Sequence, residues 1–418
     1  MNSCFIVSLL TLPLVVSSAF AQEASSAPTV AISGYGTVAM TRTDTDQAQF
    51  ARPNQASGVG KTARAGVDSN FGVQGTVGVN SWLSFTAQGL VRKDAEDDFG
   101  AELAWAFAKA KVSDKLSLRV GRVGLPVFMI SDYRNVGYAN TLLRPPTEVY
   151  AQVPINGIDG ADATWQQSLG DTTVSAQFAA GRSRSGISER GSTTLHVDMT
   201  GVTALNLAAE HGPLTLRLGR VDTTLNVDDS SQLNALTGAL RATGAGYNMA
   251  QLGTLAGALE LKKKRASFTS AGLGLDWNNL IVQSEYARRK TDSYINNTSS
   301  WYLMGGYRIG KFLPYYNHAE TKSTDHVANT VAAACPAGYP LACTPTLQAL
   351  SAGVDALSAP INQSTDSIGV RWDLYRSLAL KAQIDRVRPS AGAGQLLNVT
   401  PGFTGPVTVG AIALDFVF

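Results

Sequence analysis

The sequence predicts an all-β protein, a transmembrane antiparallel β-barrel of about 16 strands. Segments in which apolar and polar side chains alternate recur along the chain, and this period of two is that of a β-strand. Tight turns and longer polar stretches separate these segments alternately, as in barrels that cross a membrane. The last segment ends on Phe418 itself, with Ile412, Leu414 and Phe416 on the same apolar face.

Residues 1–21 are expected to be a secretory signal peptide, which leaves residues 22–418 as the barrel. The segment contains no Asp, Glu, Lys or Arg, is apolar from Phe5 to Val16, and ends in an A-x-A type cleavage site. It is shorter than the roughly 20 apolar residues that a spanning helix needs. The basic residues that usually begin a signal peptide are absent, which an incorrectly assigned start at Met1 would explain.

The alternating segments are even in number, as in bacterial single-chain barrels. The predicted strands are Thr29–Thr41, Ala63–Val79, Trp82–Arg92, Gly100–Val112, Lys115–Val123, Gly160–Leu169, Thr172–Arg182, Thr194–Glu210, Leu214–Thr224, Ala266–Trp277, Leu280–Lys290, Ser299–Ile309, Phe312–Lys322, Thr365–Asp373, Leu378–Arg388 and Pro406–Phe418.

Short turns and long loops alternate between these strands. Short turns are predicted at Asn80-Ser81, Ser113-Asp114, Gly170-Asp171, His211-Gly212, Asn278-Asn279, Gly310-Lys311 and Leu374–Ser377. The other gaps are longer, and two of them, Leu225–Arg265 and Ser323–Ser364, reach about forty residues. The uncharged stretches in these two gaps contain several glycines or prolines, so we expect both to be loops.

Charged and apolar side chains fall on opposite faces of the predicted strands. Leu116, Leu118 and Val120, for example, oppose Ser117 and Arg119. Unpaired backbone groups cost several kcal/mol each in hydrocarbon, so the sheet must close, with its apolar face toward lipid. Sixteen strands enclose more space than their side chains fill, which predicts a water-filled channel. Further lumen-facing residues are predicted at Arg217, Arg371 and Asp373.

The composition excludes several other classes of protein. The chain is 44% hydrophobic, too little for a helical membrane protein and too much for a disordered one. Its 34 basic and 32 acidic residues leave a net charge of +2, with no footprint for nucleic acid. Four histidines are the only candidate general bases, and none has a nucleophile and an orienting carboxylate in its sequence pattern. We therefore expect neither an enzyme nor a cofactor.

Two cysteines remain after removal of the signal peptide, Cys335 and Cys343. Cysteines that pass through an oxidising compartment usually pair, so the sequence predicts a disulfide within a loop. A tetrahedral metal site is the alternative, but no histidine or third cysteine lies at ligand spacing.

One continuous stretch carries a family resemblance. It resembles the third-loop stretch of Gram-negative outer-membrane porins, in the porin-like proteins with a GR-x-x-LP…SDY…VGYA…RPP-x-EVY-x-x-VP pattern. The terminal Phe418 is similar to the aromatic residue that serves as an assembly signal in outer-membrane barrels. The matching residues are Gly121, Arg122, Leu125, Pro126, Ser131, Asp132, Tyr133, Val136, Gly137, Tyr138, Ala139, Arg144, Pro145, Pro146, Glu148, Val149, Tyr150, Val153 and Pro154.

The resemblance implies a constriction loop at residues 124–159, folded into the lumen, and a homotrimer in the bacterial outer membrane. Lipids and lipopolysaccharide would surround it, and small hydrophilic solutes would pass by diffusion. Charges facing each other across the constriction would create a transverse field that favours hydrated polar solutes. The residues expected there are Arg64, Arg92 and Arg119 on the wall, and Asp132 and Glu148 on the loop.

Other roles remain open for some of these residues. Arg144 and Glu148 would alternatively pair within the loop, and Arg122 and Asp159 would anchor it. A substrate-selective channel, a barrel hydrolase and a surface adhesin are the alternative functions of the whole protein.

Overall fold

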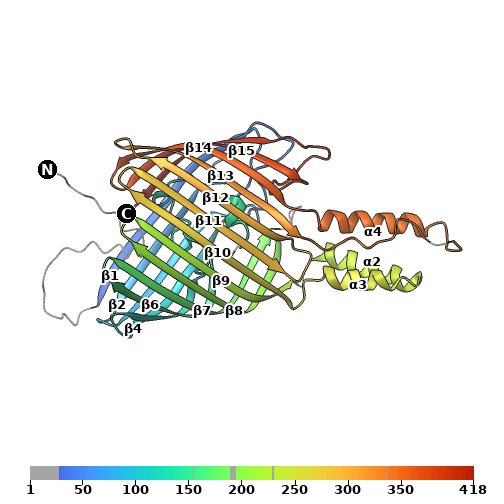
Figure 1. The fold of residues 1–418 in the computed structure, drawn as a ribbon, viewed down its shortest axis with the longest axis horizontal. Coiled ribbons are helices and arrows are strands. Elements are labelled where there is room, and N and C mark those ends of the chain that lie inside the picture. Colours follow the sequence, from blue (N-terminus) through green and yellow to red (C-terminus); the bar gives the residue numbers. More distant parts are fainter. Residues whose placement is uncertain (1–27, 154, 189–193, 228–229, 336) are drawn as a thin grey trace.

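The computed structural model describes residues 28–153, 155–188, 194–227, 230–335 and 337–418. The predicted signal peptide lies outside the described residues and stays a prediction. Sixteen strands form one closed barrel in which every neighbouring pair is antiparallel and β1 pairs with β16, which confirms the predicted fold class (Figure 1). The strands are β1 Thr29–Thr43, β2 Asn70–Gly78, β3 Leu83–Lys93, β4 Phe99–Lys111, β5 Leu116–Gly124, β6 Gly157–Leu169, β7 Thr172–Ser188, β8 Thr194–His211, β9 Leu214–Val227, β10 Lys264–Trp277, β11 Leu280–Thr291, β12 Asn297–Tyr307, β13 Phe312–Asp325, β14 Asn362–Tyr375, β15 Leu378–Ala391 and β16 Val407–Val417.

Tight turns join the strands at one end of the barrel, and longer loops join them at the other. The seven predicted short turns lie at junctions between consecutive strands, although His211 is the last residue of β8 and Leu374 and Tyr375 are the last residues of β14. Gly170, Gly212, Asn278 and Gly310 in these turns have φ values of 62°, 54°, 54° and 62°. Glycine, and next to it asparagine, adopts this left-handed region with the least strain. Figure 1 shows the C-terminus at the turn end and three helices beyond the loop end.

The seam between β1 and β16 closes the barrel. The N–H of Phe418 donates to the carbonyl of Gly34 at 3.0 Å, and the N–H of Gly34 returns a bond of 2.9 Å. On the outer face the Phe418 ring covers Gly34 and the Phe416 ring covers Gly36, and both rings lie beside Phe71 at 6.3 and 6.4 Å between centroids. Aromatic rings packed over glycines on a neighbouring strand restore the contacts that the glycines lack.

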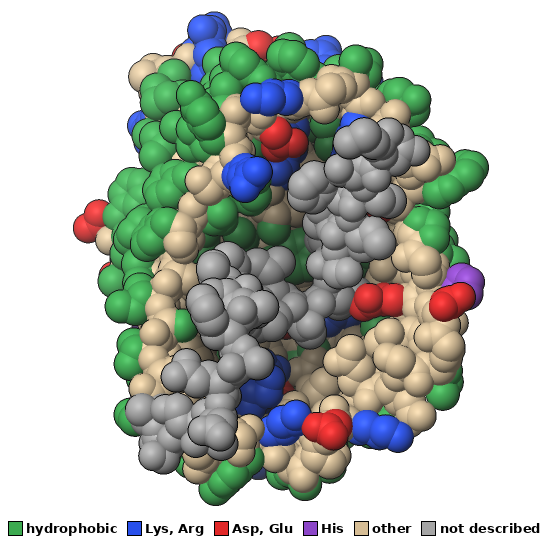
Figure 2. Space-filling model, turned by 90° about the vertical axis from the view of Figure 1, so that its left-hand side faces the viewer, with side chains coloured by type: hydrophobic (Ala, Val, Ile, Leu, Met, Phe, Trp, Pro, Cys, Tyr) green, Lys and Arg blue, Asp and Glu red, His purple; other side chains and the backbone are tan. Residues whose placement is uncertain are grey.

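Alternation of side chains divides the wall into two faces. On β9, Leu216 and Leu218 are 45% and 56% exposed on the outside, whereas Arg217 between them is 6% exposed. Figure 2 looks at the turn end, where apolar side chains cover much of the outer wall and charged ones rim the hollow interior. The outer face therefore suits hydrocarbon and the inner face suits water.

The second predicted strand, Ala63–Val79, is wrong in its first part, because β2 begins only at Asn70. Residues 44–69 form a loop, here named L1. Its backbone meets β1 through the isolated bridge between Thr41 and Arg64. The polar residues of this segment alternate like those of a strand but belong to a loop. One of them, Asp68, forms an ion pair with Arg144, which lies in a distant loop.

The prediction that both long gaps are plain loops is also wrong. They contain helices α2 Ser231–Gly246, α3 Ala250–Leu259 and α4 Cys343–Leu357. Buried leucines recur at helical spacing, as in Leu252, Leu255 and Leu259, and this shared apolar core outweighs the roughly 1 kcal/mol that each helical glycine costs. None of the helices in the described residues is long and apolar enough to span a membrane.

The structure pairs the two cysteines for which the sequence predicts a disulfide. Cys335 pairs with Cys343, the first residue of α4, with their Cα atoms 6.0 Å apart. The bond lies beyond the strands, in the loop that carries α4.

Gly36→Val should destabilise the barrel by about 1–3 kcal/mol, because a Cβ atom there would lie 2.4 Å from Cζ of Phe416 and the ring would have to move. Gly305→Val is the matched control, since Gly305 lies on the outer face of β12, away from β2–β4, with no atom within 4 Å of the added Cβ. The free energy of unfolding in detergent, followed by heat-modifiable gel migration, measures both. Equal effects would show that the ring-over-glycine contacts do not stabilise the seam.

Candidate functional site

The segment between β5 and β6, Leu125–Asn156, folds into the barrel and is here named L3. Its two ends meet where the N–H of Leu125 donates to the carbonyl of Asn156 at 3.1 Å. It contains the short helices η1 Gly137–Ala139 and α1 Thr147–Tyr150. The part of the motif stretch from Leu125 to Val153 thus lies inside the barrel.

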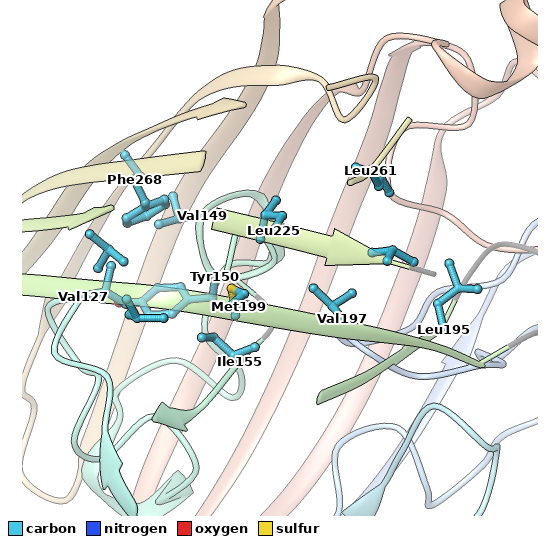
Figure 3. Packing of buried hydrophobic residues seen from close by; sticks show 14 of the residues in the cluster. Val127, Val149, Tyr150, Ile155, Leu195, Val197, Met199, Leu225, Leu261 and Phe268 are labelled. Carbon is cyan, nitrogen blue, oxygen red and sulfur yellow. The ribbon is translucent and has the colours of Figure 1, made fainter. Parts of the chain in front are cut away.

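The first arm of L3 packs against β8–β11. The Phe128 ring lies 4.7 Å from Tyr150 and 5.1 Å from Phe268 on β10. Figure 3 shows Val127, Val149 and Tyr150 in this cluster together with Met199 of β8 and Leu225 of β9. An apolar stretch of the inner wall therefore holds the loop on this side.

Polar side chains from the same strands bond the backbone of this arm. Ser270 donates to the Val127 carbonyl at 2.6 Å, and Arg217 donates to the Met129 carbonyl at 2.8 Å. Glu285 accepts from the Met129 N–H at 3.1 Å and from the Tyr150 hydroxyl at 2.7 Å. The buried backbone groups of the arm thereby find partners on the wall.

The tip of L3 is bonded to the opposite side of the barrel. Lys381 on β15 donates to the carbonyls of Gly137, Asn140 and Leu142 at 2.7, 2.6 and 3.1 Å, and it pairs with Asp415 at 2.9 Å. Both side chains of this ion pair are 0% exposed. Gly137 passes so near β16 that a Cβ atom would lie 2.1 Å from Oδ1 of Asp415, so only glycine fits.

One of the two predicted lumen-facing residues of β14, Arg371, meets the same tip. Arg371 donates to the carbonyl of Tyr138 at 2.6 Å and to that of Asn140 at 3.0 Å. Its Nε also bonds Asp373 at 2.7 Å. The structure therefore gives Arg371 a direct contact with L3, and Asp373 acts on L3 through Arg371.

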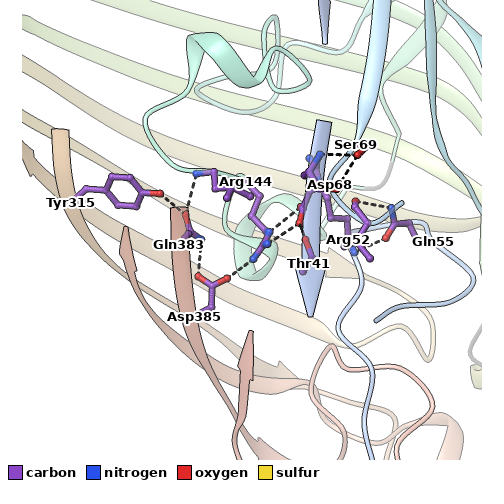
Figure 4. A network of polar contacts seen from close by, with 12 residues as sticks. Thr41, Arg52, Gln55, Asp68, Ser69, Arg144, Tyr315, Gln383 and Asp385 are labelled. Atoms are coloured by element: carbon purple, nitrogen blue, oxygen red, sulfur yellow. Dashed lines mark hydrogen bonds and ion pairs between the residues drawn. The ribbon is translucent and has the colours of Figure 1, made fainter. Parts of the chain in front are cut away.

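Arg144 of L3 is the centre of a buried ionic network (Figure 4). Its Nε and Nη2 donate to both oxygens of Asp68 in L1 at 2.9 and 2.7 Å, and Nη1 bonds Asp385 on β15. Thr41 donates to Asp68 at 2.6 Å. Burial alone would raise the pKa of Asp68, but the Arg144 guanidinium outweighs it and holds that pKa below its usual value.

Glu148 does not line the channel as expected. It is 1% exposed, lies between L3 and β14, and accepts hydrogen bonds from Gln363 at 2.7 Å and Thr365 at 2.5 Å. The alternative pairing with Arg144 is also wrong, since Arg144 bonds Asp68 and Asp385 instead. Burial raises the pKa of Glu148, and its carboxyl group anchors the loop.

The structure separates the predicted wall arginines. Arg64 lies exposed in L1, so the expectation that it lies on a wall strand is wrong. Arg92 on β3 pairs with Glu102 at 3.0 Å. Arg119 on β5 forms a bidentate pair with Asp162, whose side chain is 0% exposed, at an Nε–Oδ1 distance of 2.9 Å.

Asp132 of L3 has its nearest cationic partner in Arg217, at 3.8 Å, and it is 51% exposed. Arg122 and Asp159, the alternative anchors of the loop, pair at 2.7 Å across β5 and β6, next to the two ends of L3.

Two functional candidates were missed in the sequence, Arg52 in L1 and Arg134 in L3. Together with Arg92 and Lys93 they line a pocket between L1, L3 and β3. Arg134 lies inside the recognised motif stretch, in SDYRNVGYA, which was a usable signal. No signal in the sequence pointed to Arg52, because L1 was not expected to return into the barrel.

A second cavity of about 370 Å³ adjoins the first, between β3, β4, β7 and the ends of L1 and L3. Arg92 and Glu102 line it. Within the described residues, no three side chains of His, Cys, Asp or Glu come together in a way that would hold a metal ion. His318, the strand histidine, lies on the outer face of β13 with Nδ1 2.8 Å from Asp366.

Arg144→Met should lower the free energy of unfolding by roughly 3–5 kcal/mol, because it leaves Asp68 and Asp385 buried without their counter-charge. The triple variant Asp68→Asn, Arg144→Met, Asp385→Asn should recover most of this loss, since no unpaired charge remains. Denaturant titration of the detergent-folded barrel measures both. A triple variant as unstable as the single one would show that the charges are not the cause.

The geometry is that of solved outer-membrane barrels. No protein-family model and no curated protein matches the sequence. In-vitro folded OmpT of Vibrio cholerae, in a trimer form, superposes with a TM-score of 0.50 and 12% identity, over 94% of this chain and 100% of that one. OmpF of Salmonella typhi, in complex with daunomycin, gives a TM-score of 0.52 and 11% identity, over 93% and 97%. The channel DcaP of Acinetobacter baumannii gives a TM-score of 0.52 and 9% identity, over 94% of this chain and 97% of that one. The chain therefore has the porin fold.

Proposed function

We propose that this protein is an outer-membrane porin through which small hydrophilic solutes and ions diffuse passively. The observation that carries the proposal is a closed barrel of sixteen strands with a loop tied inside it by the buried ion pairs of Arg144 and by hydrogen bonds from Lys381. A barrel of this size leaves an aqueous channel, and a loop held within narrows that channel to a defined opening. The likeness to solved outer-membrane channels supports the same function.

Charge on the inner wall sets which solutes pass. Arg119 and Arg92 lie on β5 and β3, and Asp132 lies on L3 with half its side chain exposed. Fixed charges in a narrow, low-dielectric passage act strongly on a passing ion, whereas distant charges are screened. We therefore propose these three residues as the charged lining of the constriction, with a weak preference for anions.

A homotrimer in the outer membrane is part of the proposal. The outer face of β2–β4 carries small residues such as Gly75, Ala87, Ala106 and Ala108, which give a flat surface for another copy. One solved OmpT is described as a trimer form. At the loop end, the basic run Lys262–Arg265 would meet lipopolysaccharide phosphates, since clustered cations attract polyanions.

The refolded protein should conduct ions in discrete steps in a planar bilayer. The reason is that sixteen strands enclose more space than their side chains and L3 fill. Liposome swelling with small sugars checks the same property without a voltage. A barrel that folds, by gel migration, and yet passes neither ions nor sugars would refute the porin function and favour an adhesin or a hydrolase.

Arg119→Glu should shift the zero-current potential in a salt gradient toward cation selectivity, and adding Arg92→Glu should shift it further. Arg119→Gln, which removes one charge rather than reversing it, should give about half the shift of Arg119→Glu. Asp132→Lys should act in the opposite direction. All shifts should shrink as salt rises, because the screening length is about 10 Å at 0.1 M and shorter above it.

Charge reversal at Lys262–Arg265, where the loop after α3 runs into the first two residues of β10, is the control for the reversal potentials. If it changes the potential while the Arg119 and Arg92 variants do not, the constriction lies elsewhere.

A further inference from the structure

The pocket between L1, L3 and β3 is lined by four cationic side chains, Arg52, Arg92, Lys93 and Arg134, and by no Asp or Glu. Gln55, Asn135 and Asn156 provide further polar groups. The pocket combines three separate elements, because Arg52 comes from L1, Arg92 and Lys93 from β3, and Arg134 from L3.

Two of the four cations have carboxylate partners outside the pocket lining. Arg92 bonds Glu102 at 3.0 Å, and Lys93 bonds Asp97 at 2.6 Å. Within the described residues, no carboxylate lies within 4.0 Å of the guanidinium groups of Arg52 and Arg134. These two cations carry the uncompensated charge of the pocket.

The surroundings of Arg134 are neutral. Its Nη2 donates to the carbonyl of Ile155 at 2.6 Å and to Oδ1 of Asn156, and its guanidinium lies 5.9 Å from the centroid of the Phe128 ring. The carboxylate that acts on it electrostatically is Glu102, which Arg92 already binds. Burial, together with repulsion from Arg92, lowers the pKa of Arg134 to about 9.

The position of Arg52 is similar, and Figure 4 shows it on the L1 side of Asp68. Asp68 attracts it, but both oxygens of that carboxylate bond Arg144. Arg92 and Arg144 repel it. Asp415 also attracts Arg52, but it pairs with Lys381. Every carboxylate that acts on Arg52 or Arg134 is thus bonded to another cation.

The walls of the pocket are held in place. L1 reaches across the barrel mouth, where Asn54 donates to the carbonyl of Gly186 on β7 at 2.9 Å and accepts from the N–H of Ser188 at 3.1 Å. L3 is fixed by the Arg144 network, which also places Arg144 over the ring of Phe50 in L1, 4.8 Å from its centroid. The guanidinium groups are therefore preorganised, and a ligand need not order them.

We propose that this pocket is a binding site for the oxyanion group, carboxylate or phosphate, of a small solute that enters the channel. Guanidinium groups present a planar fork of N–H donors that matches such oxygens, and a charge-assisted bond in a partly desolvated pocket is about twice as strong as a neutral one. The site deepens the proposed channel function and rests on it, because it names the class of solute that the passage retains.

The test uses single channels of the full-length protein in a planar bilayer, with glutarate or inorganic phosphate added to the loop side. The wild-type current should fall in a saturable way as either anion is added. Arg52→Gln should raise the half-saturating concentration about tenfold or more, as expected for loss of one charged hydrogen-bonding partner. Arg134→Lys, which keeps the charge but loses the fork, should weaken binding less than Arg134→Gln. The tighter of the two anions identifies the preferred oxyanion geometry.

Arg241→Gln is the matched control, because this substitution removes the same formal charge far from the pocket. Arg241 lies on α2 and pairs with Glu260 at 2.6 Å. It should leave the saturation curve unchanged. A current that does not saturate in the wild type, or an equal effect of Arg52→Gln and Arg241→Gln, overturns the site.

Equilibrium dialysis of the detergent-folded barrel with labelled glutarate and labelled phosphate separates the two proposals. Saturable binding of either anion that Arg52→Gln weakens would support the site even in a protein that does not conduct. Conducting channels that bind neither anion would overturn the site and leave the porin function standing.

Discussion

Closure of the sheet between β1 and β16 is the constraint on which the other features depend. A sheet surrounded by hydrocarbon has no water for its edge groups, so each strand must find two neighbours. The last residue, Phe418, completes this pairing with Gly34, and the two terminal rings fill the space over glycines of β1. Once the sheet is closed, its inner face encloses a volume that its own side chains leave open.

That open volume explains why L3 is held by charge as well as by apolar packing. On the side of β8–β11 the inner wall offers Phe268 and Leu225, and the loop packs against them. On the side of β14–β16 and L1, Arg144, Lys381 and Glu148 fasten it to polar partners. A buried ion pair gives modest net stability, but breaking it is costly, so such contacts favour one arrangement of a loop over its alternatives.

Pairing within the lumen also decides which charges a solute meets. Arg119 is engaged by Asp162 and Arg92 by Glu102, so the field of each is partly cancelled at its source. Arg52 and Arg134 have no such ion-pair partner among the described residues. The strength of a site therefore depends on local compensation more than on the net charge of +2.

The sequence alone determined the class of fold, because strand alternation is local. The period of two along β9, the turn residues at Gly170 and Asn278, and the apolar end at Phe418 all lie within a few residues of the structure they specify. The sixteen strands were predictable for this reason. Local patterns also gave one wrong prediction. Residues 63–69 alternate like a strand, but they form part of L1, where Asp68 binds Arg144, 76 positions away.

Only the tertiary structure decided the site. Glu148 became an anchor because Thr365 and Gln363, more than 200 positions later, lie opposite it, and Arg64 left the wall because L1 turns back over the mouth. Arg52, Arg92 and Arg134 share a pocket only because two loops and a strand converge after the barrel has closed. A charge is read from the sequence, but its compensation depends on distances that closure alone creates.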